Sequence, residues 1–276
     1  MSSTIKHLYV HVPFCARRCS YCDFAIAVRA RVPVAEYVDA LRRELGMRYA
    51  ATAERPVLDT LYFGGGTPSR LGGAGVASAI EAVRDHATLA PGAELTIEVN
   101  PEDVSDDALA AWTEAGVNRL SIGSQSFSEQ ALGWMHRGHG AAGIARAVER
   151  ARAHGIRNIS LDLIFALPDQ VERSWDDDIA RALALEPEHL SLYGLTVEPA
   201  TPLARWRERG ETSEASEDRY EEEFLRAHDR LSAAGFAHYE VSNFARPGYE
   251  SRHNSSYWFG APYGGVGPSA HAFDGM

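Results

Sequence analysis

Cysteine is scarce in this 276-residue chain, and its only three copies, Cys15, Cys19 and Cys22, lie in one short segment. A disulfide framework uses an even number of cysteines spread through the fold, so this arrangement favours a metal or cluster site in a reducing compartment. Runs of lysine and arginine are also missing, and the net charge is −11. The chain therefore lacks the basic surface that a nucleic-acid partner requires.

Long apolar runs are absent too. No stretch approaches the roughly 18 apolar residues of a membrane-spanning helix, and the start MSSTIKHLYV has no apolar signal-peptide core. Hydrophobic residues nevertheless make up 45% of the chain, enough for a substantial folded core. We therefore expect a globular protein located in the cytoplasm.

Strand-like and helix-like segments alternate along most of the chain. The strand-like runs are short, and the helix-like runs carry apolar residues at helical spacing, with Ser105 suited to an N-cap and Gly116 to a C-cap. The expected strands lie within 7–13, 58–69, 94–101, 117–127, 156–168 and 188–196. The expected helices lie within 34–45, 75–86, 105–116, 141–155, 174–187 and 217–235.

Alternation of this kind predicts an α/β fold with a parallel sheet, whose post-strand loops carry the chemistry. We favour a partial (β/α)6 barrel over residues 1–235, and a doubly wound open sheet is the alternative. Residues 236–276 are rich in Gly, Pro, Asn and aromatics, and contain one strand-like run, HYEVSNF (238–244). This second segment is expected to be an irregular extension.

The cysteine loop HVPFCARRCSYCDF directly follows the first expected strand. A structural zinc ion needs four ligands, so a histidine such as His11 would have to complete the set. A [4Fe-4S] cluster held by three thiolates instead leaves one iron free to bind a small molecule. Apolar neighbours such as Phe14 and Phe24 would shield such a cluster from water.

A triple glycine in YFGGGTPS (62–69) follows the second expected strand. Consecutive glycines allow backbone amides to approach an anionic or zwitterionic ligand closely. The run lacks both G-x-G-x-x-G spacing and a Walker lysine, which disfavours a dinucleotide site or a P-loop. A tight turn is the alternative, but the neighbouring cysteine loop favours a ligand.

The spacing C-x3-C-x2-C after the first strand of a β/α barrel resembles that of the radical S-adenosylmethionine (SAM) enzymes. The resemblance implies that the open iron binds the amino and carboxylate groups of SAM. In that family the reduced cluster passes one electron to the sulfonium and releases a 5′-deoxyadenosyl radical.

Further segments narrow the resemblance and extend it over essentially the whole chain: GGGTPS, IEVNPED, RLSIGSQSF, SLDLIFALPDQ and HNSSYW occur in this order. Together they look like the branch that holds oxygen-independent coproporphyrinogen III oxidase and the HemW-type haem chaperones. By this resemblance the cofactor-binding residues are Tyr9, Tyr21, Gly65, Gly66, Thr67, Glu98, Gln125, Arg137, Asp162 and Thr196. The same resemblance makes Cys15, Cys19 and Cys22 the cluster ligands.

Two departures separate this chain from the oxidases of that branch. Their pattern continues to a fourth cysteine, where this chain has Phe24, and they carry a longer segment before the first strand. The motif HNSSYW, His253 to Trp258, resembles the H-N-x-x-Y-W motif associated with haem binding. His253 could therefore ligate haem iron; alternatively, the motif pins an irregular segment against the barrel mouth.

The resemblance thus favours a chaperone that binds a [4Fe-4S] cluster, SAM and haem and delivers haem to acceptor proteins. A membrane-associated acceptor is compatible with it, and cleavage of SAM would require an electron donor. The alternatives are oxygen-independent coproporphyrinogen oxidation and a radical SAM enzyme with another substrate. Members of this family normally continue beyond GPSAHAFDG into a further C-terminal domain. We therefore expect residues 236–276 to be the start of that domain and the rest of it to be lacking.

Replacing Cys15, Cys19 or Cys22 with Ala tests the cluster assignment. We expect each variant to lose iron and the visible absorbance of the cluster after anaerobic reconstitution, because each thiolate binds one iron. Unchanged iron content and absorbance would contradict the assignment, and retained zinc in place of iron would favour the structural zinc site.

Overall fold

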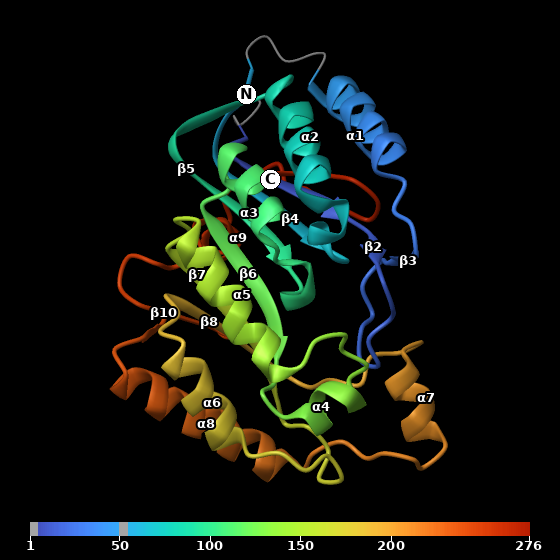
Figure 1. Ribbon diagram of the computed structural model, residues 1–276, viewed down its shortest axis with the longest axis vertical. Coiled ribbons are helices and arrows are strands. Elements are labelled where there is room, and N and C mark those ends of the chain that lie inside the picture. The colour runs from blue at the N-terminus through green and yellow to red at the C-terminus, as the bar shows by residue number, and fades with distance from the viewer. Residues whose placement is uncertain (1–4, 50–54) are drawn as a thin grey trace.

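The computed structural model describes residues 5–49 and 55–276. Its centre is a nine-stranded sheet in the order β11-β1-β4-β5-β6-β7-β8-β10-β9 (Figure 1). Six strands form the parallel body of the sheet, and each pairs with the next one along the chain. They are β1 (His7–Val12), β4 (Val57–Gly65), β5 (Thr88–Val99), β6 (Arg119–Gln125), β7 (Asn158–Phe165) and β8 (His189–Gly194).

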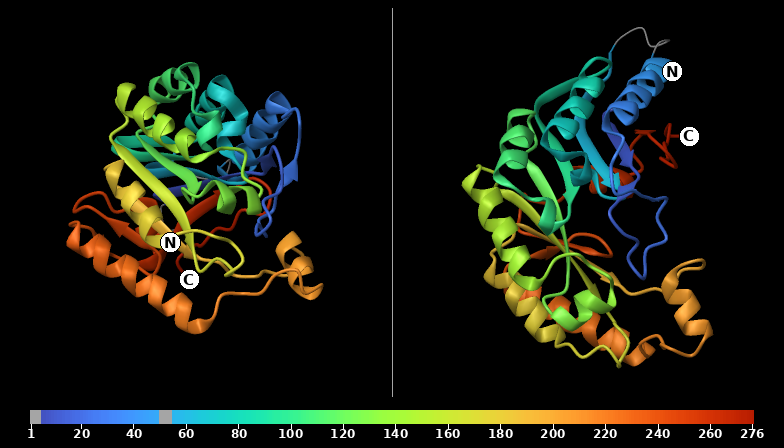
Figure 2. Two further views of the ribbon diagram at one scale, coloured as in Figure 1. Left: turned by 60° about the horizontal axis from the view of Figure 1, so that its bottom comes forward. Right: turned by 45° about the vertical axis from the view of Figure 1, so that its right-hand side comes forward.

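Helices alternate with these strands and lie on the convex side of the curved sheet (Figure 2). The covering helices are α1 (Val34–Tyr49), α2 (Gly72–Arg84), α3 (Asp106–Glu114), α5 (Ala141–Ala153), α6 (Trp175–Ala184) and α8 (Glu217–Ala233). The predicted N-cap of α3 is confirmed, since the Ser105 side chain accepts from Ala108 N; the C-cap is Ala115, and Gly116, with φ 96°, directly follows it. Short helices α4 (Glu129–Trp134) and α7 (Pro202–Glu208) lie at the lower end of the molecule in Figure 1.

The strand order confirms the partial barrel. A doubly wound sheet reverses its strand order at a switch point and carries helices on both faces, whereas here the six parallel strands lie side by side in the order in which they occur along the chain. Within the described residues, the edge strands β11 and β9 do not pair with each other. The sheet is therefore a curved, incomplete barrel with an accessible concave face.

The two faces of the sheet differ in chemistry because side chains alternate along each strand. Leu120 and Ile122 of β6 join the apolar core with the helices, whereas Arg119 and Ser121 line a cavity on the concave side. The other parallel strands repeat this pattern; core-facing examples are Leu8, Val10, Leu61, Phe63, Ile97, Leu161 and Leu190. Burial of this apolar face drives the sheet and helices together.

The C-terminal segment is more regular than expected. The run 238–244 is not one strand: β9 (Ala237–His238) and β10 (Asn243–Ala245) pair antiparallel, with a turn between them closed by the bond from Tyr239 N to Asn243 O. The run HYEVSNF resembles one strand because the alternation of apolar and polar residues, which has a period of two, continues through the turn. Pairing with β8 makes β10 an extension of the main sheet.

Two further elements of this segment were not expected. Strand β11 (Tyr263–Val266) pairs parallel with β1, and HNSSYW lies on helix α9 (Arg252–Trp258) rather than on irregular chain. The segment YGGV was not predicted as a strand because its two glycines have low strand propensity. Glycine is required at position 265, because a Cβ there would lie 1.9 Å from His271 O. Residues 236–276 thus extend both edges of the sheet, and the division at 235 stays a prediction.

Within residues 5–49 and 55–276, no helix combines the length and the apolar character needed to cross a bilayer.

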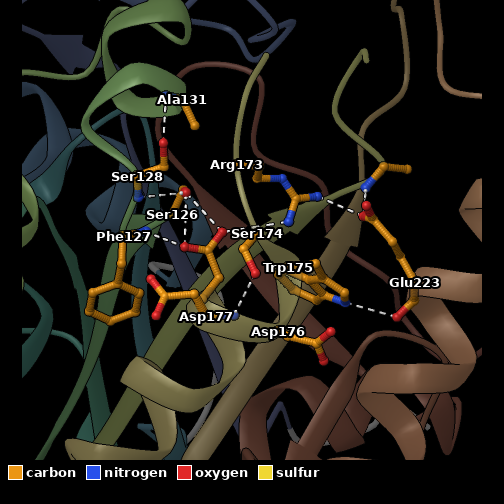
Figure 3. A network of polar contacts seen from close by, with 12 residues as sticks. Ser126, Phe127, Ser128, Ala131, Arg173, Ser174, Trp175, Asp176, Asp177 and Glu223 are labelled. Carbon is orange, nitrogen blue, oxygen red and sulfur yellow. Dashed lines mark hydrogen bonds and ion pairs between the residues drawn. The ribbon is translucent and has the colours of Figure 1, made fainter. Parts of the chain in front are cut away.

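A buried ion-pair network joins two strand ends to two helices (Figure 3). The Arg173 side chain is fully buried, 2.6 Å from Glu223 of α8 and 3.5 Å from Asp178 of α6. Asp178 accepts from Ser126 Oγ at 2.8 Å, and Glu223 accepts from Ala166 N at 2.7 Å. The network therefore fixes the backbone where β6 and β7 end.

Replacing Arg173 with Met should lower the free energy of unfolding by about 3–5 kcal/mol, because the buried Asp178 loses its cation and Glu223 keeps only Arg219 as a partner. Urea unfolding followed by circular dichroism measures this change. Arg207, whose ion pair with Glu214 is half-exposed, is the matched control, and Arg207→Met should cost less than about 1 kcal/mol. Equal effects of the two substitutions would contradict a special role for the buried network.

Candidate functional site

The cysteine loop is framed by a small two-stranded sheet. Strand β2 (Phe14–Cys15) pairs with β3 (Ala27–Val28), which closes the loop at its base. Ser20 at the centre of the loop donates its N–H to Met135 O and accepts from Leu203 N. The loop is thus held between the end of α4 and the start of α7, above the carboxyl ends of the strands.

The three thiols have different neighbours. Cys15 Sγ lies 3.4 Å from Thr67 Oγ1, and Cys19 Sγ accepts from Arg137 Nη1 at 3.4 Å. Burial raises the pKa of the Cys15 thiol, and it raises the pKa of Cys22 to about 11. Both thiols are therefore protonated at neutral pH, so binding to iron must displace their protons.

The possible fourth zinc ligand is already engaged. His11 Nε2 lies 2.9 Å from Ala25 O, and its Nδ1 lies 3.3 Å from Tyr9 OH. Nowhere in the described part of the chain do three or more His, Cys, Asp or Glu side chains converge on a position for one metal ion. A cubane differs from a single ion because each thiolate binds a different iron.

An outer cavity of about 340 Å³ opens between the cysteine loop and the strand ends. All three cysteines line it. Of the predicted cofactor residues, those that line it are Tyr21, Gly65, Gly66, Thr67, Glu98, Gln125, Arg137, Asp162 and Thr196. The fold therefore brings nearly all of the predicted site together around one space.

Glu98 of β5 is held at the floor of this cavity. Its two oxygens accept from Tyr62 OH at 2.9 Å and from Gly65 N at 3.1 Å. Burial and the nearby Asp162 raise the pKa of Glu98 to about 7. Its carboxyl group is consequently poised between the neutral and the charged form near physiological pH.

Asp162 and Gln125 reach the cavity from β7 and β6. Asp162 accepts from the hydroxyls of Ser121 at 3.0 Å and Ser160 at 3.2 Å, and burial raises its pKa. Gln125 has φ 64° at a register shift in the β6–β7 pairing. This irregular backbone redirects the Gln125 side chain from the regular alternation of the strand.

Arg137 connects the loop to the sheet. Its Nη2 donates to Asn100 Oδ1 at 2.6 Å and to Gly123 O at 2.8 Å, while Nη1 reaches Cys19. Its Nε is buried without a hydrogen-bond partner. One guanidinium group thus crosslinks three segments around the cavity.

The triple glycine lies where it cannot be replaced easily. Gly65 has φ 107°, and a Cβ there would lie 2.4 Å from the His11 ring. A Cβ on Gly66 would lie 2.7 Å from the Pro13 carbonyl. The glycines therefore permit a close approach of β4 to the cysteine loop and expose backbone to the cavity.

Tyr9 and His253 lie elsewhere, in a second cavity of about 200 Å³ on the concave face, called here the inner cavity. The two cavities share four lining residues, which are Glu98, Ser121, Asp162 and Tyr193. The Tyr9 ring stacks on Tyr62 at 6.0 Å between centroids. The inner cavity therefore adjoins the outer cavity at the two shared carboxylates, Glu98 and Asp162.

His253 is buried, and both of its ring nitrogens have partners. Nδ1 lies 2.7 Å from Thr60 Oγ1, and Nε2 lies 2.7 Å from Tyr257 OH. Burial lowers the pKa of His253 to about 3, so the ring is neutral. In this conformation the ring offers no free nitrogen to iron, and the prediction that it ligates haem now requires the Tyr257 contact to open.

Sequence reasoning missed Arg119 and His189, which also line the inner cavity. Arg119 is 2% exposed, and its Nε has no hydrogen-bond partner. His189 is hydrogen-bonded through both ring nitrogens, to Ser160 and Tyr239. Polar residues at every second position of these strands are the signal that could have revealed this concave polar face.

The chain is similar to proteins of one known family. Residues 9–182 match the radical SAM superfamily. The chain is 42% identical to "Heme chaperone HemW" of Mycobacterium tuberculosis H37Rv and 40% identical to that of Escherichia coli K12, over 98% and 96% of this chain. It spans 70% and 69% of those relatives.

A solved structure is also similar. Coproporphyrinogen III oxidase (HemN) from Escherichia coli, described as a radical SAM enzyme, superimposes with a TM-score of 0.85 at 26% sequence identity. The match covers all of this chain and 66% of the oxidase chain. The incomplete barrel is thus a known architecture for radical SAM proteins.

Replacing Glu98 with Gln tests the unusual carboxyl group. The folded protein keeps a proton on Glu98 that the unfolded chain has lost above its ordinary pKa of 4.5. The free energy of unfolding should therefore fall as the pH rises from about 4.5 to 7, and Glu98→Gln should remove about 1–3 kcal/mol of that fall.

Urea unfolding at pH 5 and pH 7.5 checks this expectation. The matched control is Glu114→Gln, which changes an exposed glutamate on α3 and should keep the wild-type profile. If the free energy of unfolding depended on pH in the same way for Glu98→Gln and the wild type, the pKa of Glu98 would not be raised by its burial.

Proposed function

The chain belongs to the HemW haem-chaperone family of the radical SAM superfamily, and on this basis we propose that it binds a [4Fe-4S] cluster, SAM and haem and delivers haem to acceptor proteins. One observation carries the proposal: the three cysteines and all of the predicted SAM residues except Tyr9 surround the same outer cavity. The fold thus brings residues that lie far apart in the sequence, from Cys15 to Thr196, to one cavity.

The residues present fit a cluster with an open iron. The donor set consists of Cys15, Cys19 and Cys22, and Arg137 beside Cys19 would compensate the negative charge of the bound cluster. When bound, such a cluster supplies single electrons and one iron for an exchangeable ligand. Apolar groups of the same loop, including Phe24 and Ile26, line the cavity and restrict water.

The floor of the cavity fits SAM. Carboxylates at Glu98 and Asp162 can accept hydrogen bonds from ribose hydroxyls, and Gln125 can both donate and accept. The Gly65–Thr67 segment brings backbone close to the cavity. These groups would bind and orient a charged nucleoside.

Haem delivery implies acceptor proteins, which can be membrane-associated, and an electron donor if SAM is cleaved. We place the protein in the cytoplasm, where cysteines stay reduced. The likeness to the oxidase favours one competing activity, oxidative decarboxylation of coproporphyrinogen. Phe24, at the position of the fourth oxidase cysteine, argues against that activity.

A paired measurement on the anaerobically reconstituted protein tests the proposal. We expect haem binding in an absorbance titration and SAM binding in a calorimetric titration, without turnover of coproporphyrinogen when SAM and a reductant are supplied. Formation of protoporphyrinogen would make the oxidase the correct assignment. Failure to bind haem would reject the chaperone function.

A substitution at Asp162 tests the proposed SAM site separately. Asp162→Asn should weaken SAM binding about tenfold or more, because hydrogen bonds to a charged group are lost from a buried position. The matched control is Asp229→Asn on the exposed side of α8, which should bind SAM as the wild type does. Unchanged affinity in Asp162→Asn would place SAM elsewhere.

A further inference from the structure

The histidines of the chain differ in whether their rings are free to bind a metal. Eight of the 11 use a ring nitrogen in a hydrogen bond, namely His7, His11, His139, His154, His189, His228, His238 and His253. The structure records no such bond for the rings of His86, His136 and His271. Of these three, His136 lines a cavity, and it is the outer one.

His136 is exposed at the mouth of that cavity, one residue before Arg137. Its backbone has φ 59°, a conformation that residues other than glycine rarely adopt. The preceding residue, Met135, accepts the backbone bond from Ser20 of the cysteine loop. The turn that follows α4 therefore holds the backbone of His136 close to the cysteine loop.

The surroundings of His136 suit a large planar ligand with acidic edges. Trp206 of α7 contacts the His136 ring edge-to-face at 5.3 Å, and Phe24, 60% exposed, lines the same cavity. The Arg17 guanidinium lies nearby, since its Nη2 would be 3.4 Å from a Cβ on Gly138. Aromatic rings pack on a porphyrin, and arginine pairs with carboxylates.

We propose that His136 ligates the iron of haem at the mouth of the outer cavity, beside Trp206 and Phe24 and with Arg17 placed for a propionate. This inference rests on the proposed haem-chaperone function. Binding forms one Fe–N bond from the lone pair of a neutral imidazole and displaces the weakly held axial ligand of the iron. No oxidation state changes in this step.

An exposed ligand also agrees with delivery of the cargo. A ligand at the rim lets an acceptor protein approach the haem and compete for it directly. His253, by contrast, is 2% exposed and hydrogen-bonded through both nitrogens. Release from that position would first require the core around α9 to open.

The test is a haem titration of the cluster-reconstituted protein, in which the cysteines are occupied by iron. His136→Gly is the informative variant because glycine adopts φ 59° readily, so the fold should be kept. We expect its haem affinity to fall about tenfold or more, with loss of the imidazole signature in the ferrous carbonyl spectrum. Added imidazole should restore that signature.

Controls separate this inference from the proposed function. His86→Ala and His271→Ala should bind haem as the wild type does. Wild-type haem binding and spectra in His136→Gly would overturn the inference while leaving the haem function standing, and loss of binding in His253→Gln with an unchanged circular dichroism spectrum would assign the ligand to α9. A wild-type protein that binds no haem would reject both.

Discussion

The alternation of apolar and polar residues along the parallel strands is the constraint on which the rest of the structure depends. One face of the sheet is apolar and must be covered, and the helices cover it. The opposite face is polar and concave, and it therefore forms cavities. Glu98, Ser121 and Asp162 belong to both cavities because they point to this face from neighbouring strands.

The site also depends on backbone that regular strands do not have. Gln125 and His136 have positive φ values on either side of α4, and Ala166 has one directly after β7. Such conformations cost about 1–3 kcal/mol each and persist only where the surroundings enforce them. The Arg173 network supplies that enforcement beside Gln125 and at Ala166, since it binds Ser126, Phe127 and the Ala166 backbone.

Much of the fold could be predicted because its signals are local. Six strands and six helices follow from periodicity, and the cap at Ser105 follows from its hydroxyl. Strand β11 could not be predicted, because its two glycines have low strand propensity and its pairing partner β1 is more than 250 residues away. Arg119 was missed for a related reason: the cavity in which it is buried is lined by residues that lie far from it in the sequence, such as Tyr9 and His253.

The sequence by itself determined the thiol set, the alternation of β/α units and the family resemblance, because each resides in short segments. Only the tertiary structure decided that Tyr9 and His253 line a different cavity from the other predicted cofactor residues. It also decided that the His253 ring is occupied, since its partner Thr60 is 193 residues away in the sequence. Hydrogen-bond partners brought together by the sheet, and not the motif around a residue, decide which histidine is free to bind iron.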